Sequence, residues 1–417
     1  MDKFLIKGPN RLNGSISIGG AKNAVLPLMT ACIIHPGKYI LNNVPILRDT
    51  ITMAKLLEMV GAQVEIYKNS FLINTKNCNK PYAPYDLVST MRASFYVLGP
   101  FMSRFKEAQV SLPGGCAWGP RPVDFHIKAL EKMGAQINLT DGYIKASGRL
   151  KGTNIIFDKS SVGATGNIMM AAVNAKGTTK IENSALEPEI DCLMNFLNTM
   201  GANINRDSNN NIIIKGESKF RDNFEFDVIP DRIEAGTFMI ATAMCKGKVK
   251  LNNVNPNHLS IVIDKLIQSG SNIVINNNSL TIESKNRPKP VDIDTLIYPG
   301  YPTDLQAQWM ALMSIANGSS KIIDNIYTDR FTHIAELERL GANISLNSNI
   351  ATINGVKSLK GAQVMSTDIR ASASLVIAGL FADKDTEISR IYHIDRGYEN
   401  IENKFSKLGA KITRIKK

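Results

Sequence analysis

A short phrase recurs six times along the chain and constrains the fold more than any other feature. Each copy has leucine-like residues at helical spacing, then a glycine, then alternating apolar residues, as in LLEMVGAQV and ELERLGANI. The six glycines are Gly61, Gly134, Gly201, Gly270, Gly341 and Gly409. Successive glycines are 73, 67, 69, 71 and 68 positions apart, so the pattern predicts a protein built from six repeated units.

Each copy predicts a helix, its end and a strand. Apolar residues at i, i+3 and i+4 are typical of an amphipathic helix. The glycine supplies the left-handed residue that ends such a helix. The alternating residues that follow, such as Ala-Gln-Val-Glu-Ile after Gly61, indicate a half-buried strand.

A second kind of helix is expected before each copy. The six segments are apolar on most faces and rich in small residues: AKNAVLPLMTACII, MRASFYVLGPFM, GATGNIMMAAVNA, EAGTFMIATAMC, TDLQAQWMALMSIA and RASASLVIAGLFA. Such a helix has to be buried nearly all round. Each unit therefore reads strand, buried helix, strand, amphipathic helix and strands. The 417 residues predict two α/β domains of three units each, with sheets that face solvent on one side.

Composition excludes several classes of protein. The five cysteines, at positions 32, 78, 116, 192 and 245, form no C-x-x-C pair, which favours a reducing compartment over a disulfide framework or a zinc site. The longest apolar stretches, near 24–34 and 371–382, are too short to span a bilayer. The first ten residues do not resemble a signal peptide. We expect a soluble cytoplasmic protein without membrane insertion; the residues indicate no oligomeric state.

The net charge of +12 has two explanations, an anionic partner or a composition rich in Lys, Asn and Ile. The chain has no run of five basic residues, so a nucleic-acid partner is not expected. No two histidines have metal-ligand spacing, and there is neither a G-x-x-x-x-G-K-[ST] loop nor a G-x-G-x-x-G turn. Composition bias together with a phosphate-binding site accounts best for the charge.

Polar residues gather where the six buried helices begin. They are Lys22-Asn23, Arg92, Ser161-Val162-Gly163, Asp231-Arg232, Asp304, and Asp368 with Arg370. A helix N-terminus binds anions through its free N–H groups and its dipole. The alternative is that the Asp and Ser residues are only N-caps. Caps need neither Lys nor Arg, so the set as a whole predicts a ligand site where parallel helix ends converge, with two such faces across a domain cleft.

The loop from Leu112 to Asp124 breaks the repeat with a glycine pair and three prolines, and it holds Cys116. A lone cysteine is usually a small buried hydrophobe. We assign that role to Cys32, Cys192 and Cys245, which lie among helical apolar residues. Cys78 lies in a polar turn without an evident role. The loop around Cys116 instead favours an exposed, reactive thiol.

Several motifs together resemble one family. They are Gly19-Gly-Ala-Lys-Asn23, Leu112-Pro-Gly-Gly-Cys116, Arg121-Pro-Val-Asp124, Pro302-Thr-Asp304, Thr367-Asp-Ile-Arg370 and Tyr392-His-Ile-Asp-Arg-Gly-Tyr398. They are similar to those of the UDP-N-acetylglucosamine 1-carboxyvinyltransferases, which are enolpyruvyl transferases. The resemblance spans the whole chain and implies a two-domain inverted α/β barrel with the active site in the interdomain cleft. It implies one domain of residues 1–21 and 229–417 and another of 22–228, which carries the Cys116 loop, so that the chain crosses between the domains twice.

The resemblance also implies roles for individual residues. The catalytic residues would be Cys116, Asp304, Lys22 and Arg396. Cys116 would donate a proton to phosphoenolpyruvate, Asp304 would take the proton of the sugar 3-hydroxyl, and Lys22 and Arg396 would act on the donor. Burial is expected to raise the basicity of Asp304. The substrate-binding residues would be Lys22, Asn23, Arg92, Arg121, Pro122, Val123, Asp124, Phe125, Lys159, Ser160, Ser161, Val162, Asp304, Ile326, Asp368, Arg370 and Arg396. The partners would be phosphoenolpyruvate and UDP-N-acetylglucosamine, with no metal and no cofactor.

Three rivals to this reading differ in what they require. A 5-enolpyruvylshikimate-3-phosphate synthase would share the fold and the donor, but it has no need of the Cys116 loop. A ring-forming nucleic-acid clamp would suit six α/β units and a basic chain, but it needs phosphate contacts spread over a surface. A scaffold without activity would not need the set of Asp, Arg and Cys residues.

Overall fold

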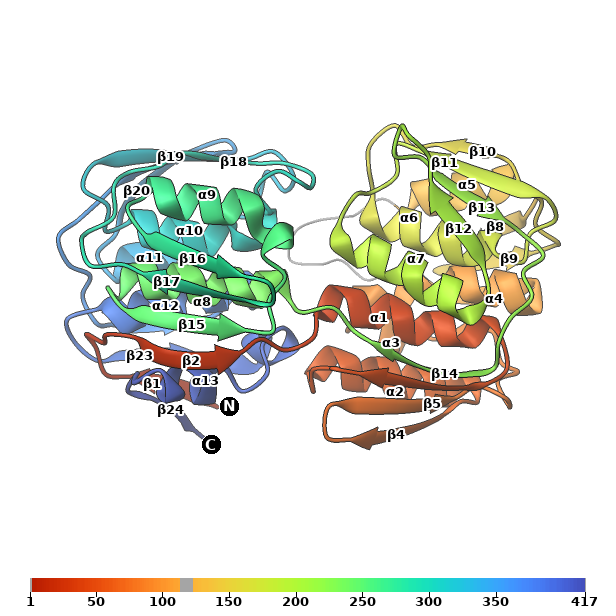
Figure 1. Ribbon diagram of the computed structural model, residues 1–417, viewed down its shortest axis with the longest axis horizontal. Helices are drawn as coiled ribbons and strands as arrows, with labels where there is room; N and C mark the ends of the chain where they lie inside the picture. Colours follow the sequence, from red (N-terminus) through yellow and green to blue (C-terminus); the bar gives the residue numbers. More distant parts are fainter. Residues whose placement is uncertain (1, 113–122, 417) are drawn as a thin grey trace. The chain divides into compact units, whose positions relative to one another are not determined.

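The computed structural model describes residues 2–112 and 123–416 and divides into two compact units (Figure 1). Unit 1 combines Met1–Gly19 with Pro230–Lys417, and unit 2 is Gly20–Ile229. Each unit has its own hydrophobic core, and the two sets of buried core residues have no member in common. The units are therefore described one at a time.

The described residues form six four-stranded sheets, three in each unit. In unit 2 the strand orders are β14 (Asn223–Asp227), β3 (Lys38–Asn42), β5 (Ser70–Asn74), β4 (Gln63–Tyr67); β6 (Tyr82–Ala83), β7 (Glu107–Ser111), β9 (Tyr143–Ser147), β8 (Gln136–Thr140); and β10 (Asn154–Ile156), β11 (Thr178–Glu182), β13 (Ile212–Lys215), β12 (Asn203–Arg206). In unit 1 they are β16 (Asn272–Asn276), β17 (Ser279–Glu283), β15 (Lys248–Asn252), β2 (Asn13–Ser17); β18 (Ile293–Thr295), β19 (Ser319–Asp324), β21 (Ile350–Asn354), β20 (Asn343–Asn347); and β22 (Gln363–Met365), β23 (Thr386–Ser389), β1 (Lys3–Ile6), β24 (Ile412–Ile415).

Every sheet contains one parallel strand pair, and its other pairs are antiparallel. A parallel pair needs a crossover, and within one repeat the buried helix supplies it, as between β10 and β11. Buried and less buried residues alternate along most strands, as in β3 and β5. The sheets thus cover the helices on one side and face solvent on the other, as the sequence predicts.

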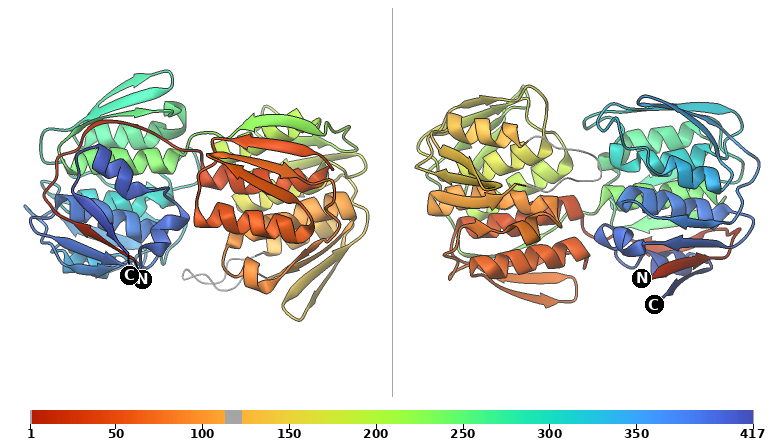
Figure 2. Two further views of the ribbon diagram at one scale, coloured as in Figure 1. Left: turned by 90° about the horizontal axis from the view of Figure 1, so that it is seen from below. Right: turned by 180° about the vertical axis from the view of Figure 1, so that it is seen from behind.

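Two repeats exchange their first strands. Strand β2 pairs with β15 instead of β3, and β14 pairs with β3 instead of β15. The chain consequently passes from unit 1 to unit 2 at Gly19–Gly20 and back at Ile229–Pro230. Strand β1 fills the sixth sheet between β23 and β24, so the two ends of the chain lie side by side in Figure 2.

Three buried helices occupy the centre of each unit (Figure 1). In unit 2 they are α1 (Lys22–Ala31), α4 (Leu98–Phe105) and α6 (Val162–Ala172), and in unit 1 α8 (Arg232–Met244), α10 (Gln306–Met313) and α12 (Ile369–Phe381). Two of them begin as 3-10 turns, η2 (Arg92–Val97) before α4 and η4 (Thr303–Leu305) before α10. The reason is visible at α4. Gly99 N–H binds the Asn167 side chain instead of Phe95 O, and Pro100 has no N–H to donate.

The amphipathic helices are α2 (Arg48–Val60), α5 (Asp124–Lys132), α7 (Pro188–Met200), α9 (Ser260–Gln268), α11 (Ile334–Arg339) and α13 (Ile401–Lys407). All six repeat glycines have positive φ, between 90° at Gly341 and 115° at Gly201, so their predicted role as left-handed helix ends is confirmed. Short elements α3 (Tyr85–Val88), η1 (Cys32–Ile34), η3 (Pro256–Leu259) and η5 (Ile391–Arg396) complete the described chain.

Cys32, Cys192 and Cys245 are buried, as expected from their apolar surroundings. Cys78 is buried too, although its neighbours in sequence are polar; its side chain belongs to the core of unit 2. In residues 2–112 and 123–416, no helix is both long and apolar enough to cross a membrane. Within the same residues no group of His, Cys, Asp and Glu side chains could hold a metal ion.

Candidate active site

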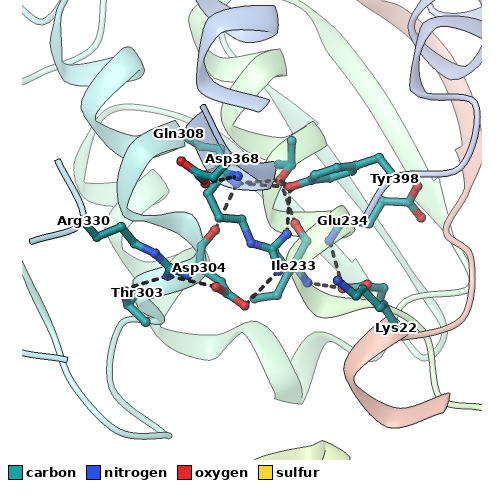
Figure 3. A network of polar contacts seen from close by, with 12 residues as sticks. Lys22, Ile233, Glu234, Thr303, Asp304, Gln308, Arg330, Asp368 and Tyr398 are labelled. Carbon is teal, nitrogen blue, oxygen red and sulfur yellow. Dashed lines mark hydrogen bonds and ion pairs between the residues drawn. The ribbon is translucent and has the colours of Figure 1, made fainter. Parts of the chain in front are cut away.

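The centre of the candidate site in unit 1 is Asp304, which lies in η4 at the beginning of a buried helix (Figure 3). Its Oδ1 accepts a hydrogen bond from Arg330 Nη1 at 2.9 Å, and its Oδ2 accepts one from Arg370 Nη2 at 2.8 Å. Both arginine side chains are about nine-tenths buried, with 9% and 10% of their surface exposed. The carboxylate thus lies between two guanidinium groups that have little contact with solvent.

The expectation that burial makes Asp304 a stronger base is wrong for this state of the molecule. Burial does raise the pKa of the carboxyl group, but Arg370 and Arg330 more than offset that effect and hold the pKa well below its usual range. Two charge-assisted hydrogen bonds to the ionised form outweigh the loss of water. Asp304 is therefore ionised and weakly basic here.

Arg330 is a site residue that the sequence reasoning missed. It follows the turn after β19, where Asp324 accepts hydrogen bonds from the backbone N–H groups of Ile326 and Tyr327. Asp324 also accepts from Thr303 Oγ1 at 2.8 Å, and Thr303 accepts from Arg330. The predicted residue Ile326 is thus fixed in the same turn that brings Arg330 to Asp304. The only signal in the sequence was an arginine in a short polar segment.

Three of the acidic and hydroxyl residues at the helix ends do form cap hydrogen bonds. Asp368 accepts hydrogen bonds from the N–H groups of Arg370 and Ala371, at 2.8 and 3.2 Å. Asp231 caps α8 in the same way, and Ser161 caps α6. Asp304 differs, because the N-cap of η4 is Pro302. Its carboxylate is directed to two arginines, which a cap does not require.

In unit 2, Lys22 is the first residue of α1, and Asn23 follows it. Lys22 Nζ lies 2.6 Å from Asp49 Oδ2, and the exposed fractions of the two side chains are 11% and 5%. Asp49, in the first turn of α2, is a second residue that the sequence reasoning missed. The ammonium group at the end of this buried helix is thus held by a buried carboxylate.

A second group of predicted residues in unit 2 lies around His126 of α5. His126 contacts the ring of Phe95 in η2, and its Nδ1 is 3.1 Å from Asn167 Nδ2 in α6. Burial, with a smaller effect of Arg92, lowers the pKa of His126 to about 3. A Cβ on Gly163 would lie 3.5 Å from the same imidazole. The ends of η2, α5 and α6 therefore meet in one place.

The remaining predicted residues divide between these regions and the undescribed part of the chain. Val123 precedes α5, Asp124 and Phe125 begin it, and Lys159 to Val162 lead into α6. In unit 1, Arg396 ends η5 and is half-buried. Cys116, Arg121 and Pro122 lie outside the described residues. The structure brings together Asp304 and Arg370, and it places Arg92 and the beginning of α6 near His126.

Comparison with solved structures gives the fold. The enolpyruvyl transferase NikO from Streptomyces tendae superposes with a TM-score of 0.91, covering 99% of this chain and 98% of that one at 22% identity. An EPSP synthase from Acinetobacter baumannii superposes with a TM-score of 0.79 over 100% of both chains at 18% identity. These likenesses confirm the predicted fold class, the two-domain inverted α/β barrel of enolpyruvyl transferases.

Comparison of sequences then gives the family. The model of the family described as EPSP synthase (3-phosphoshikimate 1-carboxyvinyltransferase) matches residues 6–405, so the chain belongs to this family. Curated relatives from Geobacter metallireducens and Thermodesulfovibrio yellowstonii are each 50% identical over 417 residues, 100% of both chains. A relative from Chlorobaculum parvum is 48% identical over 99% of this chain and 98% of its own. All three are UDP-N-acetylglucosamine 1-carboxyvinyltransferases.

Proposed function

We propose that this chain transfers the enolpyruvyl group of phosphoenolpyruvate to the 3-hydroxyl of UDP-N-acetylglucosamine and releases phosphate. The reaction is an addition followed by an elimination and is the first committed step of peptidoglycan synthesis. The observation that carries the proposal is the full-length identity of about half with relatives named for this activity. The Asp304 site supplies the base and the cationic groups that such a reaction needs.

Both substrates bring anionic groups to the cationic helix ends. We assign Lys22, Asn23, Asp368, Arg370 and Arg396 to phosphoenolpyruvate. Arg92 and the stretches 121–125 and 159–162 are assigned to UDP-N-acetylglucosamine, with Ile326 beside the sugar. A helix N-terminus with a neighbouring Lys or Arg favours phosphate and carboxylate groups. Lys22 at the beginning of α1 and Arg370 in the first turn of α12 meet this requirement.

Because the pKa of Asp304 is low, this carboxylate can act as the base only after one of its two arginine contacts is lost. While Arg330 and Arg370 both bind the carboxylate, it is a poor base. Phosphoenolpyruvate carries a carboxylate and a phosphate that compete for the same guanidinium groups. As the donor draws one arginine away, the pKa of Asp304 rises toward the range expected of a buried carboxyl group. Binding of the donor therefore prepares the base that accepts the proton of the sugar hydroxyl.

The reaction balances without another reactant. The deprotonated 3-oxygen forms a bond to C2 of phosphoenolpyruvate while Cys116 protonates C3, which gives a tetrahedral intermediate. The C2–O bond to phosphate then breaks, C3 gives a proton back to the enzyme in place of the one that Cys116 supplied, and the double bond forms again. Lys22, Arg121, Arg370 and Arg396 offset the charge of the intermediate. Protonation of C3 matters because C2 of phosphoenolpyruvate is a poor electrophile until C3 is protonated.

We place the enzyme in the cytoplasm. Both substrates are phosphorylated intracellular metabolites. The four cysteines that the structure describes are free thiols, which is the usual pattern in a reducing compartment.

Phosphate release tests the proposal directly. The purified protein is incubated with phosphoenolpyruvate alone, with UDP-N-acetylglucosamine added, and with shikimate 3-phosphate added. We expect release only with the UDP-sugar, together with a product heavier by one enolpyruvyl group in mass spectrometry. Equal or faster release with shikimate 3-phosphate would assign the chain to the other activity of the family.

A further inference from the structure

A buried network of hydroxyl and amide groups lies behind the Asp304 site in unit 1 (Figure 3). At its centre is the hydroxyl of Tyr398, whose side chain is 2% exposed. This oxygen lies 2.8 Å from Thr237 Oγ1, 3.2 Å from Gln308 Nε2 and 3.3 Å from Arg370 Nη1. The three partners belong to α8, α10 and α12, so one oxygen contacts all three central helices of the unit.

We propose that Tyr398 is a positioning residue that holds the Arg370 guanidinium in the orientation that binds Asp304 and the anionic donor. The inference rests on the proposed function, because that function gives Arg370 its substrate. Tyr398 itself is assigned no contact with a reacting atom.

The direction of each hydrogen bond follows from the number of hydrogens and lone pairs. Gln308 Nε2 shares its two hydrogens among the oxygens of Tyr398, Thr237 and Asp304. Arg370 and the Gln308 amide nitrogen can only donate to the Tyr398 oxygen, so Thr237 Oγ1 is the one of its three partners that can accept. The phenol proton must therefore go to Thr237 Oγ1. Thr237 passes its own proton to the carbonyl oxygen of Ile233, 2.8 Å away in the preceding turn of α8. Every hydroxyl proton in this chain has one place to go.

The network restrains both partners of the ion pair. Arg370 is bound at Nη1 by Tyr398 and at Nη2 by Asp304, and these two contacts fix the plane of its guanidinium. The Arg370 Cζ atom also lies 5.8 Å from the centroid of the Tyr398 ring. Gln308 Nε2 lies 3.1 Å from the backbone oxygen of Asp304, which ties η4 to the same network. A charged side chain held on two sides loses little further entropy when it binds a substrate.

The phenol remains protonated under working conditions, as the network requires. Burial raises the pKa of Tyr398, and the nearby Arg370 offsets only part of that effect. The phenol can therefore donate its proton to Thr237 across the pH range in which the enzyme would act.

Tyr398→Phe is the first test, because it removes only the oxygen. We expect the KM for phosphoenolpyruvate to rise about tenfold, since a hydrogen bond to a charged group contributes roughly 1.5–3 kcal/mol. The KM for UDP-N-acetylglucosamine should stay within about twofold. Tyr39→Phe is the matched control. Tyr39 is as deeply buried, its hydroxyl donates to His35 O at 2.9 Å, and it lies in unit 2. That variant should leave both KM values unchanged.

A double-mutant cycle separates positioning from a general structural effect. In an Arg370→Lys background, calorimetric titration with phosphoenolpyruvate should show that Tyr398→Phe changes the Kd less than about twofold. Independent tenfold effects in both backgrounds would overturn the proposal, as would equal rises in both KM values or no rise at all.

If Tyr398→Phe does not fold, Thr237→Val keeps the shape and removes the acceptor of the phenol proton, and the same split between the two KM values is expected. Failure of the wild-type protein to release phosphate would overturn the proposed function instead. Thermal unfolding of the same four proteins of the cycle would still decide whether Tyr398 and Arg370 are coupled.

Discussion

The two units share an architecture of three sheets around three buried helices, but the residues at their helix ends differ in kind. In unit 1 the negative charge of Asp304 is paired with the positive charges of Arg330 and Arg370. Uncharged side chains, such as those of Gln308 and Tyr398, form hydrogen bonds behind this cluster. In unit 2 the described helix ends include the buried ion pair of Lys22 with Asp49 and a neutral buried imidazole at His126. The repeat thus determines where the functional side chains lie. The residue types found at the beginnings of the six buried helices determine the chemistry of each position.

The largest expected effect comes from removing the central charge of unit 1. Asp304→Asn should lower kcat about 10³-fold, because it removes the proposed base. It should also lower the free energy of unfolding by about 3–5 kcal/mol, since it leaves two buried guanidinium groups without their counter-charge. Urea unfolding and phosphate release measure the two effects.

The control is Glu387→Gln, which breaks the ion pair between Glu387 and Lys3. This pair is more exposed than the Asp304 cluster, with 27% of the Lys3 side chain and 29% of the Glu387 side chain accessible to solvent. It should cost less than about 1 kcal/mol and leave turnover unchanged. Similar losses in the two variants would mean that the Asp304 cluster is only structural.

The next effect concerns the cysteines of both units. A phosphonate epoxide such as fosfomycin should alkylate Cys116 and none of the four described cysteines. Burial raises the pKa of Cys78 to about 11 and those of Cys192 and Cys245 to about 12, and it raises the pKa of Cys32 as well. At neutral pH each unit of that rise lowers the reactive thiolate fraction about tenfold.

Mass spectrometry of the labelled peptides measures the selectivity. Cys116→Ser should abolish labelling, whereas Cys78→Ser should leave it unchanged. Label on any of the four buried cysteines, with Cys116 unmodified, would remove the proposed role of the loop that holds Cys116.

Lys22→Ala should weaken phosphoenolpyruvate binding about tenfold to a hundredfold and change UDP-N-acetylglucosamine binding much less. The variant removes an ammonium group at a helix end and deprives the buried Asp49 of it. The double variant Lys22→Ala/Asp49→Ala should recover part of the lost stability but not the affinity for the donor. Calorimetric titration of each substrate decides this. Recovery of donor affinity in the double variant would show that Lys22 only neutralises Asp49.

Much of the fold could be predicted from the sequence because the repeat has local causes. Helical spacing, a left-handed glycine and alternating strands each act within about ten residues. The structure has a helix, a left-handed glycine and a strand at every predicted position, although β4, β8 and β16 contain no buried residue and so are less buried than predicted. The exchange of β2 and β14 could not be predicted in this way, because a strand pattern does not say which sheet the strand joins. The burial of Cys78 was missed for a similar reason, since its partners are distant in sequence.

The site was predictable where a motif marked it and not where a distant residue completed it. Asp304 and Arg370 lie in recognisable motifs, whereas Arg330 comes from an unremarkable turn. Arg370 and Arg330 together reverse the expected direction of the Asp304 pKa shift. Gln308 and Thr237 look like ordinary residues of apolar helices until their hydrogen bonds are seen. Electrostatics depends on which charges meet, and sequence alone shows only which charges exist.

The smallest expected effect compares one buried histidine from each unit. Burial lowers the pKa of His126 in unit 2 to about 3, with a smaller contribution from Arg92. Burial also lowers the pKa of His333 in unit 1 to about 4, where Asp368 opposes the shift and Arg330 adds to it. In each case the folded protein favours the neutral imidazole, so the unfolded chain binds more protons below its own pKa of about 6.5. Stability should therefore be fully present above pH 6.5 and should fall as the pH decreases.

Urea unfolding of the wild type, His126→Asn and His333→Asn between pH 7 and pH 3 would measure this loss. Each histidine should account for about 1.4 kcal/mol per pH unit below its unfolded pKa, or about 2 kcal/mol between pH 7 and pH 5. Each variant should lack the pH-dependent loss of stability that its missing histidine causes, whatever its free energy of unfolding at pH 7. The contribution of His333 should level off near pH 4, while that of His126 should continue toward pH 3, because the carboxylate of Asp368 faces only the former. A wild-type protein whose stability is flat from pH 7 to pH 5 would mean that both imidazoles reach water more easily than their burial indicates.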